Sequence, residues 1–129
     1  MREILFKAKR IDNGEWVEGS YLYCKGAKTV SFLNEHYILV FDGYGVSWVK
    51  IDKDTLCQYT GLTDKNGNKI WENDVVRLDE DIYIVTWEEA DAMFALEDVG
   101  VIEHFGNADS KWCEVIGNTF DNPELMKGE

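Results

Sequence analysis

Proline, cysteine and long apolar runs are scarce in this chain of 129 residues. Pro123 is its one proline, so no proline-rich linker marks a domain boundary. The three cysteines, Cys24, Cys57 and Cys113, are odd in number and widely spaced, which favours reduced, buried thiols over a disulfide framework. No apolar run approaches the ~20 residues of a membrane span, and charged residues interrupt the amino-terminal segment too early for a signal peptide. We therefore expect a cytoplasmic protein without membrane association.

Patterns that carry chemistry are also missing. The two histidines, His36 and His104, are isolated, and the chain has no C-x-x-C pair and no G-x-S-x-G elbow. Asp64 opens a calcium-loop pattern, but Lys69 and Val75 stand where that loop requires glycine and glutamate. We predict no metal, no cofactor and no catalytic residue. An enzyme built on a cysteine thiol stays open as an alternative, since spacing along the chain does not show which side chains meet in the fold.

Basic residues are nearly absent from the middle of the chain. Between residues 71 and 109, twelve Asp and Glu residues face the single base Arg77, so this segment holds −11 of the net charge of −12. Residues 1–70 are close to neutral, with ten Lys and Arg against nine Asp and Glu. An acidic field repels phosphate backbones, which argues against nucleic-acid binding by residues 71–109. The segment is typical either of a solubilising face or of a surface that attracts a basic partner.

The chain does contain a sequence pattern typical of β-structure. Short runs of alternating, β-branched and aromatic residues are bounded by Gly, Asn and Asp. They predict a first hairpin around a turn at residues 12–14 and further strands over residues 28–33, 37–41, 46–51, 75–78, 82–87 and 112–118. Residues 88–97 combine helix propensity with alternation, and we predict a turn followed by a strand there. Asn122 followed by Pro123 predicts a short terminal helix.

Residues 58–76 predict a hairpin with Asn66 and Gly67 at its tip. In a two-residue type I′ turn both central residues need positive φ, which Asn and Gly tolerate well. The turn would fix strand register, because a slip of one residue would turn a buried position such as Ile70 outward. The five tryptophans lie in or beside predicted strands, where we expect them to fill the core rather than to form a stacking platform for nucleic acid.

Several short motifs occur together: QYTGL at residues 58–62, DKNG at 64–67, IWENDVV at 70–76, EVIGN at 114–118 and NPEL at 122–125. This combination resembles the YopX family of phage and prophage proteins, and the amino-terminal ILFKA and WVEG segments also fit it. Asn73 stands where the family pattern usually has glycine, and Asn is the next-best residue for a left-handed backbone. The resemblance implies a mostly β protein with a carboxy-terminal SH3-like small barrel, a bacterial host, and no established activity.

We accordingly predict a mainly β, antiparallel protein with an amino-terminal β lobe over residues 1–57 and an SH3-like β lobe over residues 58–129, combined in one compact unit. The favoured function is that of a phage or prophage accessory protein that binds an unidentified host or phage protein through an exposed β-surface without catalysis, with a homo-oligomer left open. The alternatives are a nucleic-acid-associated protein, an acidic mimic of DNA, and a small enzyme. The family motif places the candidate binding residues at Gln58, Tyr59 and Asp74.

Overall fold

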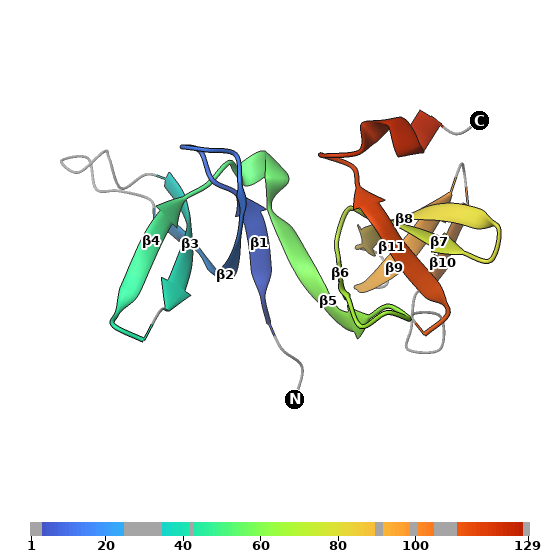
Figure 1. Cartoon of the computed structure of the whole chain (residues 1–129), viewed down its shortest axis with the longest axis horizontal. Coiled ribbons are helices and arrows are strands. Elements are labelled where there is room, and N and C mark those ends of the chain that lie inside the picture. Colours follow the sequence, from blue (N-terminus) through green and yellow to red (C-terminus); the bar gives the residue numbers. More distant parts are fainter. Residues whose placement is uncertain are drawn as a thin grey trace. The chain divides into compact units, whose positions relative to one another are not determined.

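Antiparallel strands make up most of the part of the chain that the structure describes (Figure 1). The computed structural model describes residues 4–24, 35–41, 43–89, 92–98, 101–104 and 111–127. Every pairing between its strands is antiparallel, which confirms the predicted mainly β, antiparallel class. The strand predicted over residues 28–33 lies outside the described residues. The chain divides into two compact units, Met1–Gln58 and Tyr59–Glu129.

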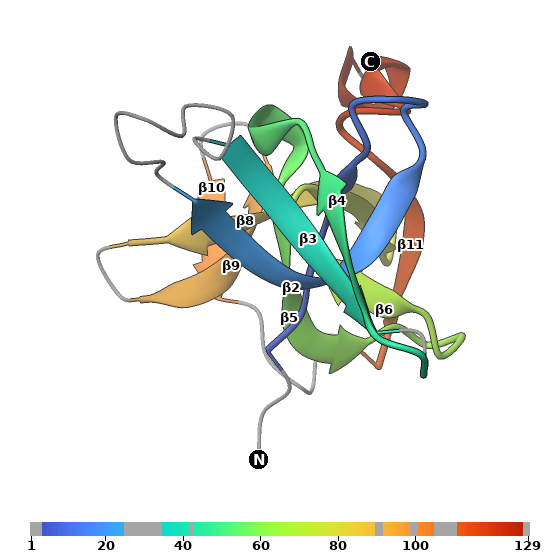
Figure 2. The same cartoon turned by 90° about the vertical axis from the view of Figure 1, so that its left-hand side faces the viewer.

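The first unit is a meander of four strands that continues into a fifth. Its elements are β1 (Phe6–Lys9), β2 (Trp16–Cys24), β3 (Glu35–Phe41), β4 (Val46–Lys50), the 3-10 turn η2 (Lys53–Thr55) and the start of β5 (Cys57–Thr63). The order across this unit is β4-β3-β2-β1-β5, and Figure 2 shows β4, β3 and β2 toward the viewer. The predicted first hairpin is confirmed, because β1 pairs with β2.

One face of the meander forms the core of the first unit. The buried cluster consists of Ala8, Ile38 and Ile51, with half-buried Phe6, Val17, Tyr21, Val40, Val49 and Leu56 packed against it. At one end, the chain that leaves β4 crosses to β1: Ile51 forms a bridge with Arg10, and the Asp52 N–H donates to the Lys9 carbonyl at 2.9 Å. The first and fourth strands are therefore tied together at that end.

The second unit contains the β5–β6 hairpin and a five-stranded sheet. Its elements after β5 are β6 (Lys69–Trp71), β7 (Asp74–Leu78), β8 (Asp81–Glu88), β9 (Met93–Asp98), β10 (Val101–His104) and β11 (Cys113–Asn118). The sheet order is β10-β9-β8-β7-β11, and the buried core is formed by Ile70, Val76, Val85, Phe94, Leu96 and Cys113. The strand predicted within residues 88–97 is confirmed by β9, and part of the turn predicted before it, residues 90 and 91, lies outside the described residues. The SH3-like barrel is not confirmed, because no sheet of the described strands closes on itself.

The predicted terminal helix exists as a short 3-10 helix, η3 (Pro123–Lys127), rather than as an α-helix. The Leu125 N–H donates to the Asn122 carbonyl at 3.1 Å, which is the i to i+3 spacing of a 3-10 turn. The Asn122 side chain accepts the Asn118 N–H at 3.2 Å. Asn122 therefore ties the end of β11 to the start of η3.

The turn at the tip of the β5–β6 hairpin differs from the predicted type I′ turn. Gly67 has φ +84°, but Asn66 is not among the residues with positive φ. The Gly67 N–H donates to the Asp64 carbonyl at 3.0 Å, and the Asp64 N–H donates to the Asn68 carbonyl at 2.8 Å. This pattern belongs to a three-residue loop, in which a type I turn is followed by a left-handed glycine. The cause is the Asp64 carboxylate, which accepts the N–H groups of Asn66 and Asn68 at 2.9 Å each.

Asp64 also attaches the hairpin to β11. Its Oδ2 accepts the Val115 N–H at 2.9 Å, and the neighbouring Lys65 N–H donates to the Cys113 carbonyl at 3.0 Å. Burial raises the pKa of Asp64, but the N–H groups of Val115, Asn68 and Asn66 outweigh burial and hold the pKa below its ordinary value of 3.8. The DKNG motif thus connects the β5–β6 hairpin to β11, two elements that are far apart in the sequence.

Replacing Gly67 with valine is expected to lower the free energy of unfolding by about 1 to 3 kcal/mol, because a β-branched residue is strained at positive φ. A Cβ at Gly67 would meet no atom within 4 Å, so a clash of this atom does not add to the backbone strain. Urea unfolding of the variant measures the loss. Gly67→Asn is the matched control, with a smaller loss, because Asn tolerates the left-handed region. Equal unfolding curves for the valine variant and the wild type would contradict this account of the turn.

Candidate functional site

Two of the predicted binding residues surround one tryptophan in the second unit. Tyr59, which is buried, pairs with Trp71 across the β5–β6 hairpin, and their ring centroids are 5.5 Å apart. The buried Asp74 accepts the Trp71 N–H at 2.8 Å and so helps to hold the turn in which Asn73 has the predicted left-handed backbone, with φ +72°. Gln58 belongs to the first unit, where it is half-buried and pairs with β1. Tyr59 and Asp74 therefore support the fold, and a binding role for the three residues stays a prediction.

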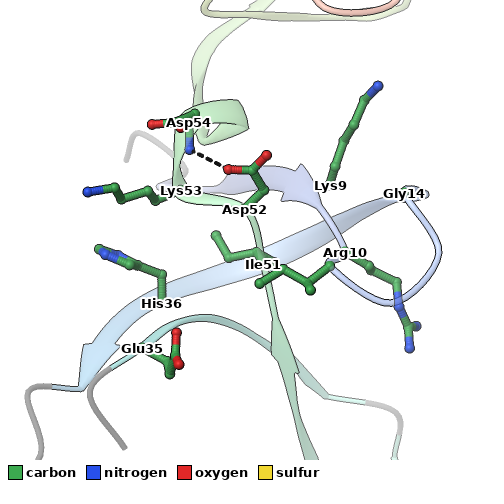
Figure 3. A pocket seen from close by; sticks show the side chains of 10 residues that line it. Lys9, Arg10, Gly14, Glu35, His36, Ile51, Asp52, Lys53 and Asp54 are labelled. Atoms are coloured by element: carbon green, nitrogen blue, oxygen red, sulfur yellow. Dashed lines mark hydrogen bonds between the residues drawn. The ribbon is translucent and has the colours of Figure 1, made fainter.

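An open groove of about 520 Å³ lies in the first unit, where the chain leaving β4 meets β1 (Figure 3). Its charged lining residues are Lys9, Arg10, Lys53, Glu35, Asp52 and Asp54. Arg10 is held by Asp12, with 2.9 Å between nitrogen and oxygen, and the Asp52 carboxylate accepts the Asp54 N–H at 3.0 Å as the cap of η2. Because three basic and three acidic residues line it, the groove has no net charge from its lining that would select a charged ligand.

His36 at the edge of this groove is a packed histidine. Its Nδ1 is 2.5 Å from the Tyr21 hydroxyl, and its ring stacks on that of Tyr23 with centroids 4.5 Å apart. Burial raises the pKa of Tyr21. Among the described cysteine side chains, Cys57 and Cys113 are both buried and neither forms a disulfide, as the sequence predicted. The Cys24 side chain lies outside the described residues.

Large apolar side chains gather on the outer face of the β3–β4 hairpin. Strand register places Phe41 opposite Val46, and Trp48 lies two residues further along β4. Direct partners share a face, and alternate residues of a strand return to it. Since Ile38 is fully buried on the other face, Phe41, Val46 and Trp48 point away from the core, with 68%, 45% and 52% of their surface exposed. Tyr44, in the connecting loop, is fully exposed. We call Phe41, Tyr44, Val46 and Trp48 the apolar hairpin face.

The tryptophans therefore do not all fill the core, and that prediction is wrong for three of them. Trp71 is buried, whereas Trp48, Trp87 and Trp112 are exposed. Alternation along a strand shows which residues share a face, but it does not show which face is covered. Trp16 is half-buried, with the Lys7 ammonium 4.6 Å from its ring.

The acidic segment of the second unit presents its charge to solvent. Its exposed acids are Asp79, Glu80, Asp81, Glu89 and Glu97. The single base of the segment, Arg77, lies 3.7 Å from the Glu114 carboxylate. The described part of the segment thus offers a predominantly acidic, solvent-facing surface.

Comparisons with known proteins bear on these surfaces. The family described as YopX protein matches residues 5–127. The chain belongs to the YopX family. Among solved structures, this YopX chain is similar to the crystal structure of protein EF1440 from Enterococcus faecalis, with a TM-score of 0.60 and 20% sequence identity over 98% of this chain and 99% of that chain. This likeness shows a shared fold. No curated protein matches the YopX chain at a significant level.

The family membership confirms the resemblance that the motifs gave. Like that resemblance, the match covers nearly the whole chain, including the first unit, where the apolar hairpin face lies. Within the part of this YopX protein that the structure describes, no helix has the length and apolar composition needed to cross a membrane.

Proposed function

We propose that this YopX protein is a phage or prophage accessory protein that binds a host or phage protein through the apolar hairpin face, without catalysis. The observation that supports the proposal is the exposure of Phe41, Tyr44, Val46 and Trp48 on one hairpin. Single exposed apolar residues are ordinary on protein surfaces, but a group that contains three aromatic rings is typical of a binding surface.

The hairpin also holds the Trp48 ring in a defined position. Tyr37 packs edge-on against Trp48, with ring centroids 5.5 Å apart, and Tyr37 is itself buried. A side chain that is already positioned loses less conformational entropy when a partner covers it. Tryptophan and tyrosine are enriched among residues that dominate binding energy, so Trp48 and Tyr44 are the expected anchors of the interface, with Phe41 beside them.

Affinity capture from a nuclease-treated bacterial lysate tests the proposal with a double variant, Phe41→Ser with Trp48→Ser. The wild type is expected to retain a specific protein at low and at moderate salt, because apolar contacts are not screened by ions. The double variant should retain at least about tenfold less of that protein, since two anchor residues are removed. Trp112→Ser is the matched control, because Trp112 is 74% exposed in the other unit. Equal capture by the double variant would contradict the proposal.

The acidic segment supports a second candidate function, in which its surface mimics a nucleic acid and binds a basic, nucleic-acid-binding protein. The exposed turn with Asp79, Glu80 and Asp81 is the observation that favours it. Such binding would weaken steeply as salt rises, unlike binding to the apolar hairpin face. A captured protein that is lost with salt but kept by the Phe41 and Trp48 double variant would move the function to this segment. Reversing the charges of Glu80 and Asp81 to lysine would then abolish capture.

A further inference from the structure

β4 has a backbone edge that no described strand covers over most of its length. It is the outermost strand of the first unit. At its end, the Ile51 N–H donates to β3 at 3.0 Å, whereas the Lys50 carbonyl accepts the Ile11 N–H at 3.1 Å on the opposite side. Backbone groups alternate in direction along a strand, so the N–H and C=O groups of Val46 and Trp48 also point away from β3. Among the described residues no strand pairs with them there.

This edge lacks the features that usually keep edge strands apart. Natural proteins protect edge strands with lysine, proline, bulges or a covering element, because an apolar edge is a template for pairing. The run Val46-Ser47-Trp48-Val49 contains no charge and no proline. The one lysine, Lys50, stands at the end that Ile11 already covers and lies 3.7 Å from Glu35.

We propose that two copies of the chain pair through β4 of each copy, antiparallel across a twofold axis at Ser47. In this register Val46 of each copy lies opposite Trp48 of the other. Each outward N–H and C=O group of these residues then has a partner, because an antiparallel pair of this kind exchanges both of its hydrogen bonds. This register follows from the alternation of backbone direction along β4. Ser47 and Val49 direct their N–H and C=O groups toward β3, whereas Val46 and Trp48 direct theirs toward the second copy.

Charge and symmetry favour a second copy as the occupant. Each chain carries a net charge of −12, nearly all of it in residues 71–109, so repulsion between two copies is weakest at a part of the surface without acids, and the run from Val46 to Val49 meets that condition. Ile11, 58% exposed beside the end of β4, adds apolar surface at the margin of the contact. A twofold contact also covers the β4 edges of both copies at once, so that neither β4 edge can add a third copy.

The pairing goes beyond the proposed function and does not depend on it. It uses the backbone of β4, whereas the proposed partner contacts the side chains of the apolar hairpin face. Two such faces would become continuous in the dimer. Variants can therefore separate the two claims, because a backbone change at the edge and a side-chain change on the face affect different contacts.

Sedimentation equilibrium over a wide range of concentration tests the pairing in the full-length protein. The wild type is expected to approach twice the monomer mass of 14.9 kDa and to dissociate on dilution. Val46→Pro removes an outward N–H and places a ring at the edge, while it leaves the β3–β4 hydrogen bonds intact. This variant should remain monomeric, with circular dichroism like that of the wild type. Trp48→Pro provides the same edge change at a second position, in case Val46→Pro does not fold.

Phe41→Ser is the matched control, because it changes the apolar hairpin face without touching the backbone of β4. It should dimerise like the wild type, whatever its effect on partner capture. A wild type that is monomeric at all concentrations would overturn the pairing. A proline variant that dimerises like the wild type would overturn it as well. So would a monomeric Phe41→Ser variant, because the dimer would then depend on side chains of the apolar hairpin face.

Discussion

Replacing Asp64 with alanine is expected to lower the free energy of unfolding by about 3 kcal/mol, because a buried donor without a partner costs roughly 1 to 3 kcal/mol. The carboxylate accepts three backbone N–H groups, from Asn66, Asn68 and Val115, each at 2.9 Å. Water can replace part of the bonding at the exposed turn, but less readily at half-buried Val115. Urea unfolding measures the loss. Asp81→Ala, at an exposed carboxylate, should change stability by no more than about 0.5 kcal/mol. Equal effects of the two substitutions would contradict the role of Asp64.

The contribution of Asp64 should also depend on pH. Its pKa in the folded protein lies below the ordinary value of 3.8, so the unfolded chain takes up the proton more readily. The stabilisation is therefore present above the unfolded pKa and is lost as the pH falls through the folded pKa. Unfolding free energies of the wild type should decline more steeply on acidification than those of Asp64→Asn. Parallel acid profiles for the two proteins would contradict this assignment.

Replacing Gly19 with alanine is expected to destabilise the first unit by about 3 kcal/mol, in the upper range of overpacking costs. A Cβ at Gly19 would lie 2.2 Å from the Leu39 carbonyl oxygen and 2.9 Å from the Ile38 side chain. The backbone oxygen cannot turn aside as a flexible side chain would, so β2 and β3 would have to separate. Thermal unfolding of Gly19→Ala, compared with Ser20→Ala at the next, exposed position, measures the effect. A midpoint like that of the Ser20 variant would show that the strands adjust without cost.

The strands were the part of the fold that the sequence predicted well. Period-two alternation and turn residues placed β3, β7, β8 and β11 close to their observed bounds. Asn73 was correctly predicted as left-handed from the family resemblance, because the family pattern usually has glycine at this position and Asn is the next-best residue for that region. These features depend on local backbone preferences, which a short stretch of sequence carries within itself.

Features set by contacts between distant residues were not predictable in the same way. The turn at Gly67 was predicted with the wrong geometry, because the buried Asp64 carboxylate draws the N–H groups of Asn66 and Asn68 toward itself. Asp64 in turn is fixed by Val115, 51 residues away in the sequence. Nothing in the local pattern indicates a donor at that distance.

The candidate surface illustrates the same limit. The family motif directed attention to Tyr59 and Asp74, whose described contacts hold Trp71 in place. From the sequence, Phe41 was placed in a strand without a role of its own, and Trp48 was expected to fill the core. Their exposure follows from which face of the first sheet packs over Ile38, and that choice depends on the whole meander. To place Phe41 and Trp48 on one face, it would have been necessary to know which residues of β3 pair with which residues of β4.

The central claim is that a protein partner covers the apolar hairpin face. Hydrogen exchange of the wild-type protein, alone and saturated with the protein that it captures, locates that contact directly. We predict added protection concentrated in β3 and β4, with residues Glu35–Phe41 and Val46–Lys50 slowed by the partner. Added protection confined to the acidic strands of the second unit, with β3 and β4 unchanged, would contradict the claim and place the interface on residues 71–109.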